Sequence, residues 1–160
     1  MSANVTLDKL SKQFPRSVIE THTYRGDATA IVRREDILAI CRFLRDDPQL
    51  AYNFMIDLTA VDYMGKEPRF EVVYHLYSLS QNQRVRIKAG VPEADCAIDS
   101  IVSIWIAADW FEREAFDLYG IVFKGHPNLK RILLYEGFEG HPLRKDYPVK
   151  KRQPLIGPKN

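Results

Sequence analysis

Two stretches of this chain alternate in the rhythm of a β-strand, and this pattern restricts the fold more than any other feature. The even-numbered positions from 70 to 76 are all apolar, and from 84 to 89 three basic residues alternate with three apolar ones. Because successive side chains of a strand point to opposite faces, each stretch packs one face of a sheet and leaves the other in water. The residues expected on the packed face are Phe70, Val72, Tyr74, Leu76, Val85, Ile87 and Ala89.

Further strands and helices complete an α+β pattern. A nearly continuous apolar run at Asn53–Val61 predicts a strand in the centre of the sheet, and Val18–Tyr24 with Ala28–Val32 reads as a hairpin. Apolar residues at helical spacing predict helices at Val5–Phe14, Glu35–Arg45 and Asp95–Ile106. We therefore expect a mixed or antiparallel sheet with helices packed on one face, followed by an extended C-terminal arm.

The composition excludes several classes of protein. A chain of 160 residues with 46% apolar and 28% charged residues suits one soluble domain, and no apolar run has the length of a membrane span. Residues 1–10 lack the apolar region of a signal peptide, so we expect a cytoplasmic protein. Cys41 and Cys96 stand far apart without a CxxC pair, which excludes a four-cysteine iron–sulfur cluster held by this chain alone.

A short helix with its own start and stop signals is expected after residue 108. Asp109 can cap its first turn, Glu112 can reach back to the N–H of the cap, and Gly120 can adopt the left-handed conformation that ends a helix. Phe111, Ala115 and Leu118 share one stripe, and the rest of the circumference is aromatic or charged.

The sequence after this helix has the character of an arm that lies along another surface. Two Gly-His-Pro turns, at 125–127 and 140–142, break its path, and a pair of basic residues follows each turn. From Ile121 onward nine Lys or Arg residues face three Asp or Glu, whereas the first 120 residues have fourteen against eighteen. We therefore divide the chain into a body (1–120), a basic docking arm (121–148) and a flexible tail (149–160).

No pattern in the chain predicts a reaction centre. Glu112, Glu114 and Asp117 invite an acid–base proposal, but ion pairing with Arg113, Lys130 and Arg131 is the simpler interpretation. A metal site formed by His126 and His141 with Glu139 or Glu114 remains an alternative. Against it, a histidine in a turn before proline more commonly hydrogen-bonds to the backbone. Phosphate-binding, dinucleotide-binding and nucleophile motifs are missing, and acidic residues interleaved in the arm argue against nucleic acid.

A long, gapless stretch of the chain resembles one known family. The sequence EREAFDLYGIVFKGHPNLKRIL, followed by GFEGHPLRKDYP, resembles the signature of the C subunit of the proton-pumping NADH:quinone oxidoreductase, respiratory complex I. The resemblance continues upstream through DLTAVDY and FEVVYHLYSLSQNQRVRIKAGVPE and covers about residues 52–148.

This resemblance implies a non-catalytic structural subunit without a cofactor in the hydrophilic arm of the complex. Its partners would be the D subunit, which helps to form the quinone site and is called the quinone-module subunit below, and neighbouring iron–sulfur subunits. It would lie on the cytoplasmic side of the inner membrane, or on the matrix side if mitochondrial. The residues carried over as docking residues are Glu112, Arg113, Glu114, Asp117, His126, Arg131, Gly140, His141, Arg144, Lys145 and Asp146.

Two alternatives stay open beside this interpretation. Glu112, Glu114 or His141 could contribute directly to quinone chemistry. The chain could also serve the equivalent role in a membrane-bound hydrogenase-type complex or in a relative with another electron donor, because a docking protein does not record which donor its distant partners oxidise.

Overall fold

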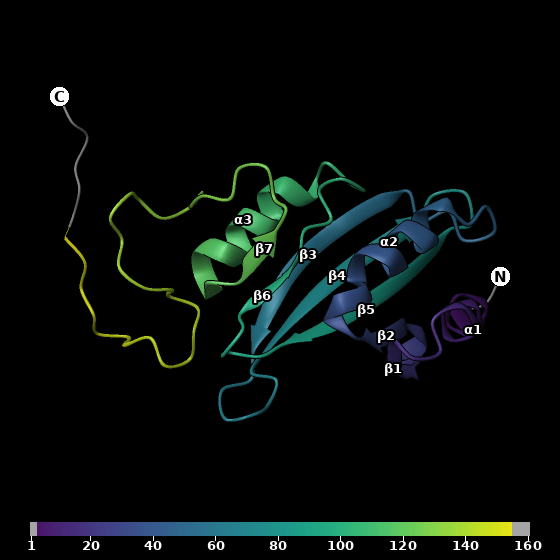
Figure 1. The fold of residues 1–160 in the computed structure, drawn as a ribbon, viewed down its shortest axis with the longest axis horizontal. Helices are drawn as coiled ribbons and strands as arrows, with labels where there is room; N and C mark the ends of the chain where they lie inside the picture. The colour runs from purple at the N-terminus through teal and green to yellow at the C-terminus, as the bar shows by residue number, and fades with distance from the viewer. Residues whose placement is uncertain (1–2, 155–160) are drawn as a thin grey trace.

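The chain folds around a five-stranded sheet with three α-helices, in a computed structural model that describes residues 3–154 (Figure 1). Residues 155–160, the last part of the predicted tail, lie outside the described residues. The helices are α1 (Ala3–Gln13), α2 (Ile37–Asp46) and α3 (Ala108–Tyr119), with short 3-10 turns at Tyr24–Gly26 and Arg34–Asp36. The strands are β1 (Val18–His22), β2 (Ala28–Val32), β3 (Phe54–Asp62), β4 (Phe70–Ser78), β5 (Gln83–Val91), β6 (Ala97–Asp99) and β7 (Val122–Lys124).

The main sheet is mixed, with the strand order β1-β2-β5-β4-β3. The predicted hairpin is confirmed, because β1 pairs antiparallel with β2. β2 then pairs in parallel with β5, while β5, β4 and β3 form an antiparallel meander. The α+β fold with a mixed sheet is therefore confirmed.

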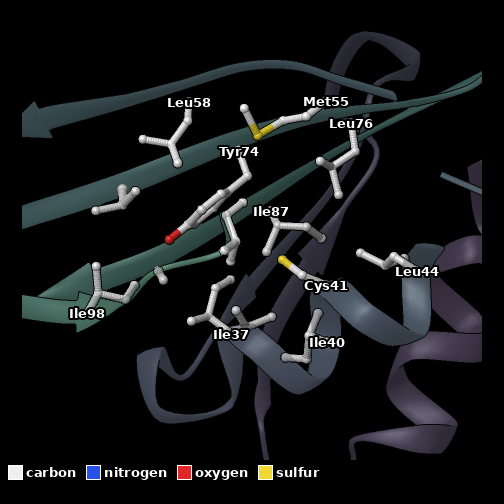
Figure 2. Packing of buried hydrophobic residues seen from close by; sticks show 14 of the residues in the cluster. Ile37, Ile40, Cys41, Leu44, Met55, Leu58, Tyr74, Leu76, Ile87 and Ile98 are labelled. Atoms are coloured by element: carbon white, nitrogen blue, oxygen red, sulfur yellow. The ribbon is translucent and has the colours of Figure 1, made fainter. Parts of the chain in front are cut away.

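A single apolar core lies between one face of this sheet and the helices. Figure 2 shows the buried face of α2, with Ile37, Ile40, Cys41 and Leu44, directed toward side chains of β3, β4 and β5. Leu7 and Leu10 of α1 and Ala108 and Ala115 of α3 belong to the same cluster. The alternation read from the sequence is confirmed, since all seven residues assigned to the packed face are buried.

The opposite face of the sheet carries the alternating basic row. Lys88 pairs with Glu71 at 2.8 Å and Arg86 approaches Asp27 at 3.6 Å, both on this face. The apolar Val73 pairs with Lys88 on this face and is only 5% exposed, because long lysine side chains cover apolar surface beside them.

The predicted central position of the strand at 53–61 is wrong, because β3 is an edge strand. The side chains of its apolar run divide between the core and the exposed side of the sheet. Met55, Leu58 and Ala60 face the core, whereas Phe54 and Ile56 on the other side are exposed. α3 packs beside β3 and supplies the apolar neighbours that a further strand would otherwise give (Figure 1).

The helix predicted at Asp95–Ile106 is also wrong. Ile98, Ile101 and Trp105 are buried, as their spacing indicated, but the backbone around them forms β6 and a series of turns. Its donors bond to distant partners, because the Ser100 N–H reaches the Lys124 carbonyl at 2.8 Å and β6 pairs in parallel with β7. Tertiary contacts thus override the helical period here.

Candidate protein-docking site

Helix α3 starts without the cap that the sequence predicts. Its N-cap position is Ala107, which makes no side-chain cap, so the expected capping box of Asp109 and Glu112 is wrong. Glu112 instead turns into the body, where its carboxylate accepts the Ser100 hydroxyl at 2.6 Å and the Ile101 N–H at 2.7 Å. The predicted stop is confirmed, because Gly120 has a φ of 76° in the left-handed region.

The Glu112 carboxyl is fully enclosed by the body of the protein. Its side chain is 0% exposed, and burial raises its pKa to about 7, in spite of the two hydrogen bonds that favour the charged form. Both of its oxygens are occupied, and no substrate reaches a fully enclosed group. The contact therefore ties α3 to the turn that follows β6.

Asp117 is the point where α3 holds the arm. One of its carboxylate oxygens accepts the backbone N–H groups of Ile132, Leu133 and Leu134 at 2.9 to 3.1 Å. The other accepts Nη1 of Arg131 at 2.7 Å. Burial alone would raise the pKa of Asp117, but these hydrogen bonds hold it below its ordinary value. A buried carboxylate with four donors fixes the path of residues 131–134.

The second Gly-His-Pro turn packs against the same end of α3. His141 places Nδ1 2.9 Å from the Asp117 carbonyl oxygen, and Arg131 donates from Nη2 to the Gly140 carbonyl at 3.1 Å. Burial lowers the pKa of His141 below its ordinary value. A Cβ on Gly140 would lie 2.9 Å from the Tyr147 ring, so the close approach of the arm to itself requires glycine here.

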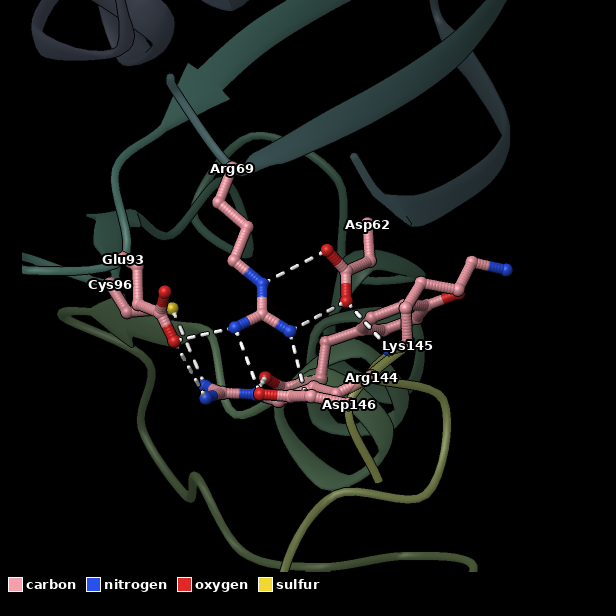
Figure 3. A network of polar contacts seen from close by, with 8 residues as sticks. Asp62, Arg69, Glu93, Cys96, Arg144, Lys145 and Asp146 are labelled. Carbon is pink, nitrogen blue, oxygen red and sulfur yellow. Dashed lines mark hydrogen bonds and ion pairs between the residues drawn. The ribbon is translucent and has the colours of Figure 1, made fainter. Parts of the chain in front are cut away.

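A second clamp centres on Arg69, a residue that the sequence analysis did not select (Figure 3). Its guanidinium is nearly buried and donates twice to Asp62, at 2.9 and 3.0 Å, and twice to Asp146, at 2.7 and 3.1 Å. Glu93 accepts a further bond at 2.6 Å. The hydrogen bond from Arg69 is the main cause that lowers the pKa of Asp62 and of Asp146. The body and the arm therefore share one arginine.

Three consecutive residues of the arm approach the Arg69 group through different contacts, namely Arg144, Lys145 and Asp146. Arg144 donates from Nε to the Tyr119 carbonyl at 2.6 Å and lies over the Phe70 ring. The backbone N–H of Lys145 donates to Asp62 at 2.8 Å. In Figure 3 the side chain of Lys145 points away from the network that its neighbours join.

The other residues assigned to docking lie around α3. Arg113 does not pair with Asp117 at i+4 but donates to the carbonyls of Lys130 and Arg131, at 3.1 and 3.3 Å. Glu114 is exposed on the helix. His126 has a buried side chain whose Nε2 lies 3.2 Å from the Asp109 carbonyl oxygen. The structure thus brings together Asp117, Arg131 and His141 in one group and Arg144, Lys145 and Asp146 in another.

A metal site and a membrane-spanning helix each require a particular arrangement of the described residues. Within residues 3–154 no three His, Cys, Asp or Glu side chains are placed to hold a metal ion, and both cysteines are free thiols. None of the described helices has the length and apolar character needed to cross a bilayer. The two histidines of the proposed metal alternative bond instead to separate stretches of α3 backbone.

Residues 30–153 match the model of the respiratory-chain NADH dehydrogenase 30 kDa subunit family. The chain belongs to this family. Among its relatives, the C subunit of the NADH-quinone oxidoreductase of Geotalea uraniireducens is 50% identical over 96% of this chain and 94% of that protein. The protein of the same name from Geobacter metallireducens is 52% identical over 96% of both chains.

Solved structures share the fold of this family member. A trypsin-resistant fragment (1-134) of Nqo5 is 29% identical, with a TM-score of 0.63, and the match covers 78% of this chain and 99% of the fragment. A chain of the membrane-bound sulfane sulfur reductase, an archaeal respiratory membrane complex, shares the fold with a TM-score of 0.74 at 24% identity, over 92% of this chain and 86% of that chain.

Proposed function

We propose that this chain is the C subunit of an NADH-quinone oxidoreductase, in which it is a non-catalytic part of the peripheral arm and docks the quinone-module subunit. Membership of the 30 kDa subunit family and about 50% identity to proteins named as the C subunit support the first half of the proposal. The docking role rests on the geometry of the arm.

The observation that carries the docking role is the double attachment of the arm to the body. Between β7 and Pro154 the chain has no helix or strand, yet Asp117 fixes residues 131–134 and Arg69 fixes Asp146. An irregular segment that is held in one shape before binding loses little conformational entropy when a partner covers it. Two of its leucines remain open to a partner, since Leu133 is 61% exposed and Leu143 46%.

Direct participation in quinone chemistry is the weaker candidate. Glu112 is enclosed in the body, and the ring of His141 lies against the Asp117 carbonyl. Glu114 is exposed on the surface of α3, whereas an acid–base site needs its titratable groups inside a cleft. Of the residues selected from the sequence, Asp117, Arg131 and His141 make contacts that hold the arm.

The proposal extends to the setting of the complex. In this role the chain would be peripheral, on the cytoplasmic side of the membrane, next to the quinone-module subunit and iron–sulfur subunits, in an assembly that passes electrons from NADH to quinone and pumps protons. The fold shared with a chain of the sulfane sulfur reductase keeps a complex with another electron donor as an alternative.

Arg144→Ala in the assembled complex tests the docking role. The change removes the bond to the Tyr119 carbonyl and the contact with Phe70, and both hold the arm in place. We expect a lower yield of complex that contains the quinone-module subunit, with unchanged NADH:quinone turnover for each complex that does assemble. An unchanged yield with an altered quinone KM would instead support direct participation in the quinone site. Arg16→Ala, at an exposed arginine just after α1, is the matched control.

A further inference from the structure

In each basic pair of the arm, the arginine side chain contacts the rest of the chain and the lysine side chain is exposed to solvent. In Lys130-Arg131 the arginine bonds to Asp117, and in Arg144-Lys145 the arginine bonds to the Tyr119 carbonyl. Both lysines are exposed, and within the described residues the ion pairs of these two segments are made by Arg131, Arg144 and Asp146. The two arginines thus make intramolecular contacts, and the ammonium groups of the two lysines remain available to a partner.

The backbone of each lysine is fixed although its side chain is free. The carbonyl of Lys130 accepts Nε of Arg113 at 3.1 Å, and the N–H of Lys145 donates to Asp62 at 2.8 Å. A leucine with a fixed backbone and an exposed side chain stands three residues after Lys130, and another stands two residues before Lys145. The Leu133 N–H bonds to Asp117, and the Leu143 N–H bonds to the Leu118 carbonyl at 3.1 Å.

We propose that Lys130 and Lys145, each beside an exposed leucine, are the two contact points of the arm and that they bind carboxylates bordering apolar recesses on a neighbouring protein of the complex. This inference rests on the proposed docking function and names the chemistry of the surface that is docked. Asp117, Arg131, Arg144 and Asp146 are then positioning residues that present these contacts and do not touch the partner.

Charge complementarity supports an acidic protein as the occupant. Asp62, Glu93 and Asp146 surround Arg69, Asp117 holds Arg131, and in the arm itself Glu139 lies 3.6 Å from Lys151. Within the described residues, no ion pair involves Lys130 or Lys145. Paired lysine and leucine contacts fit a protein surface in which carboxylates border an apolar recess, because such interfaces combine an apolar centre with a polar rim.

Carbodiimide cross-linking of the assembled complex tests this inference. The reagent joins a lysine to a carboxylate only when the two are in contact, so mass spectrometry should find Lys130 and Lys145 joined to Asp or Glu of a neighbouring protein. Lys130→Arg with Lys145→Arg should abolish these products and leave assembly intact, because arginine keeps the charge. Cross-links from other lysines of this chain, without these two, would overturn the inference.

Charge reversal supplies an independent measurement on the same complex. Lys130→Glu with Lys145→Glu should weaken association of the full chain with its partner about tenfold or more at low salt, because like charges then face each other, and added salt should restore part of the loss by screening this repulsion. Lys12→Glu with Arg16→Glu, at two exposed positions on and just after α1, changes the charge equally and should have no effect.

The outcomes separate this inference from the function on which it rests. Lower assembly with Arg144→Ala but not with the double charge reversal would keep the docking role and reject the lysine contacts. Normal assembly with both would reject the docking role itself. Normal assembly with loss of binding to phosphatidylglycerol vesicles would assign the lysines to a membrane surface and also overturn the inference.

Discussion

Replacing Asp117 with asparagine should release the arm from α3 while the body stays folded. The carboxylate serves four donors, and an amide of the same shape presents an NH2 group to one side of that set, either to Arg131 or to the three backbone N–H groups. Breaking a buried ion pair by removing one partner costs about 3 to 5 kcal/mol. Because the Arg131 side chain is 25% exposed, we expect the lower limit, about 3 kcal/mol, in the free energy of local opening.

Hydrogen exchange at the amides of Ile132, Leu133 and Leu134 measures this opening directly. A change of about 3 kcal/mol corresponds to exchange that is faster by a factor on the order of a hundred. Amides in β4 and β5 should keep their rates, because they open only with the whole body. Glu114→Gln, on the same helix with an exposed carboxylate, should leave all of these rates unchanged. Exchange at residues 132–134 that is as slow in Asp117→Asn as in the parent chain would refute the role assigned to Asp117.

Two further changes test the buried polar groups. Glu112 has a pKa raised to about 7, so the parent chain should lose about 3 kcal/mol of stability relative to Glu112→Gln as the pH rises from 4.5 through 7. Below pH 4.5 the difference in stability between the two chains should stay constant. Urea unfolding at pH 4.5 and pH 8 measures this difference, and a value that does not vary with pH would contradict the prediction. Arg69→Lys should lower the free energy of unfolding by about 3 kcal/mol, because one ammonium cannot serve Asp62, Glu93 and Asp146 together. An unchanged urea midpoint for this variant would mean that the Arg69 clamp does not stabilise the chain.

The sequence predicts local features of this fold better than long-range ones. The hairpin, the helix at 35–45 and the alternating faces of β4 and β5 follow from periods that each segment carries within itself. The edge position of β3 and the strand at 97–99 depend on partners more than twenty residues away, namely α3 and β7. The apolar run and the helical spacing identified buried residues there but could not identify the backbone that holds them.

The candidate site shows the same division. Its arm, its turns and most of its charged residues are visible in the sequence, yet the direction of each side chain is not. Arg131 and Lys130 look equivalent in the sequence, and only the position of Asp117 makes one an internal contact. Arg69 and Asp62 were missed because each stands at a strand end among many charged residues. Their one sequence signal is that an arginine and an aspartate flank the turn between two apolar strands.

Photo-cross-linking from the arm in the assembled complex tests the docking claim most directly. A benzophenone amino acid at Leu133 or Leu143, whose side chains are exposed while their backbones are fixed, would react with whatever lies against the arm. Docking predicts cross-links to the quinone-module subunit from both positions and none from Leu79, an exposed leucine in the turn between β4 and β5. Complexes that assemble fully and yield no adduct to the quinone-module subunit from either position would contradict it.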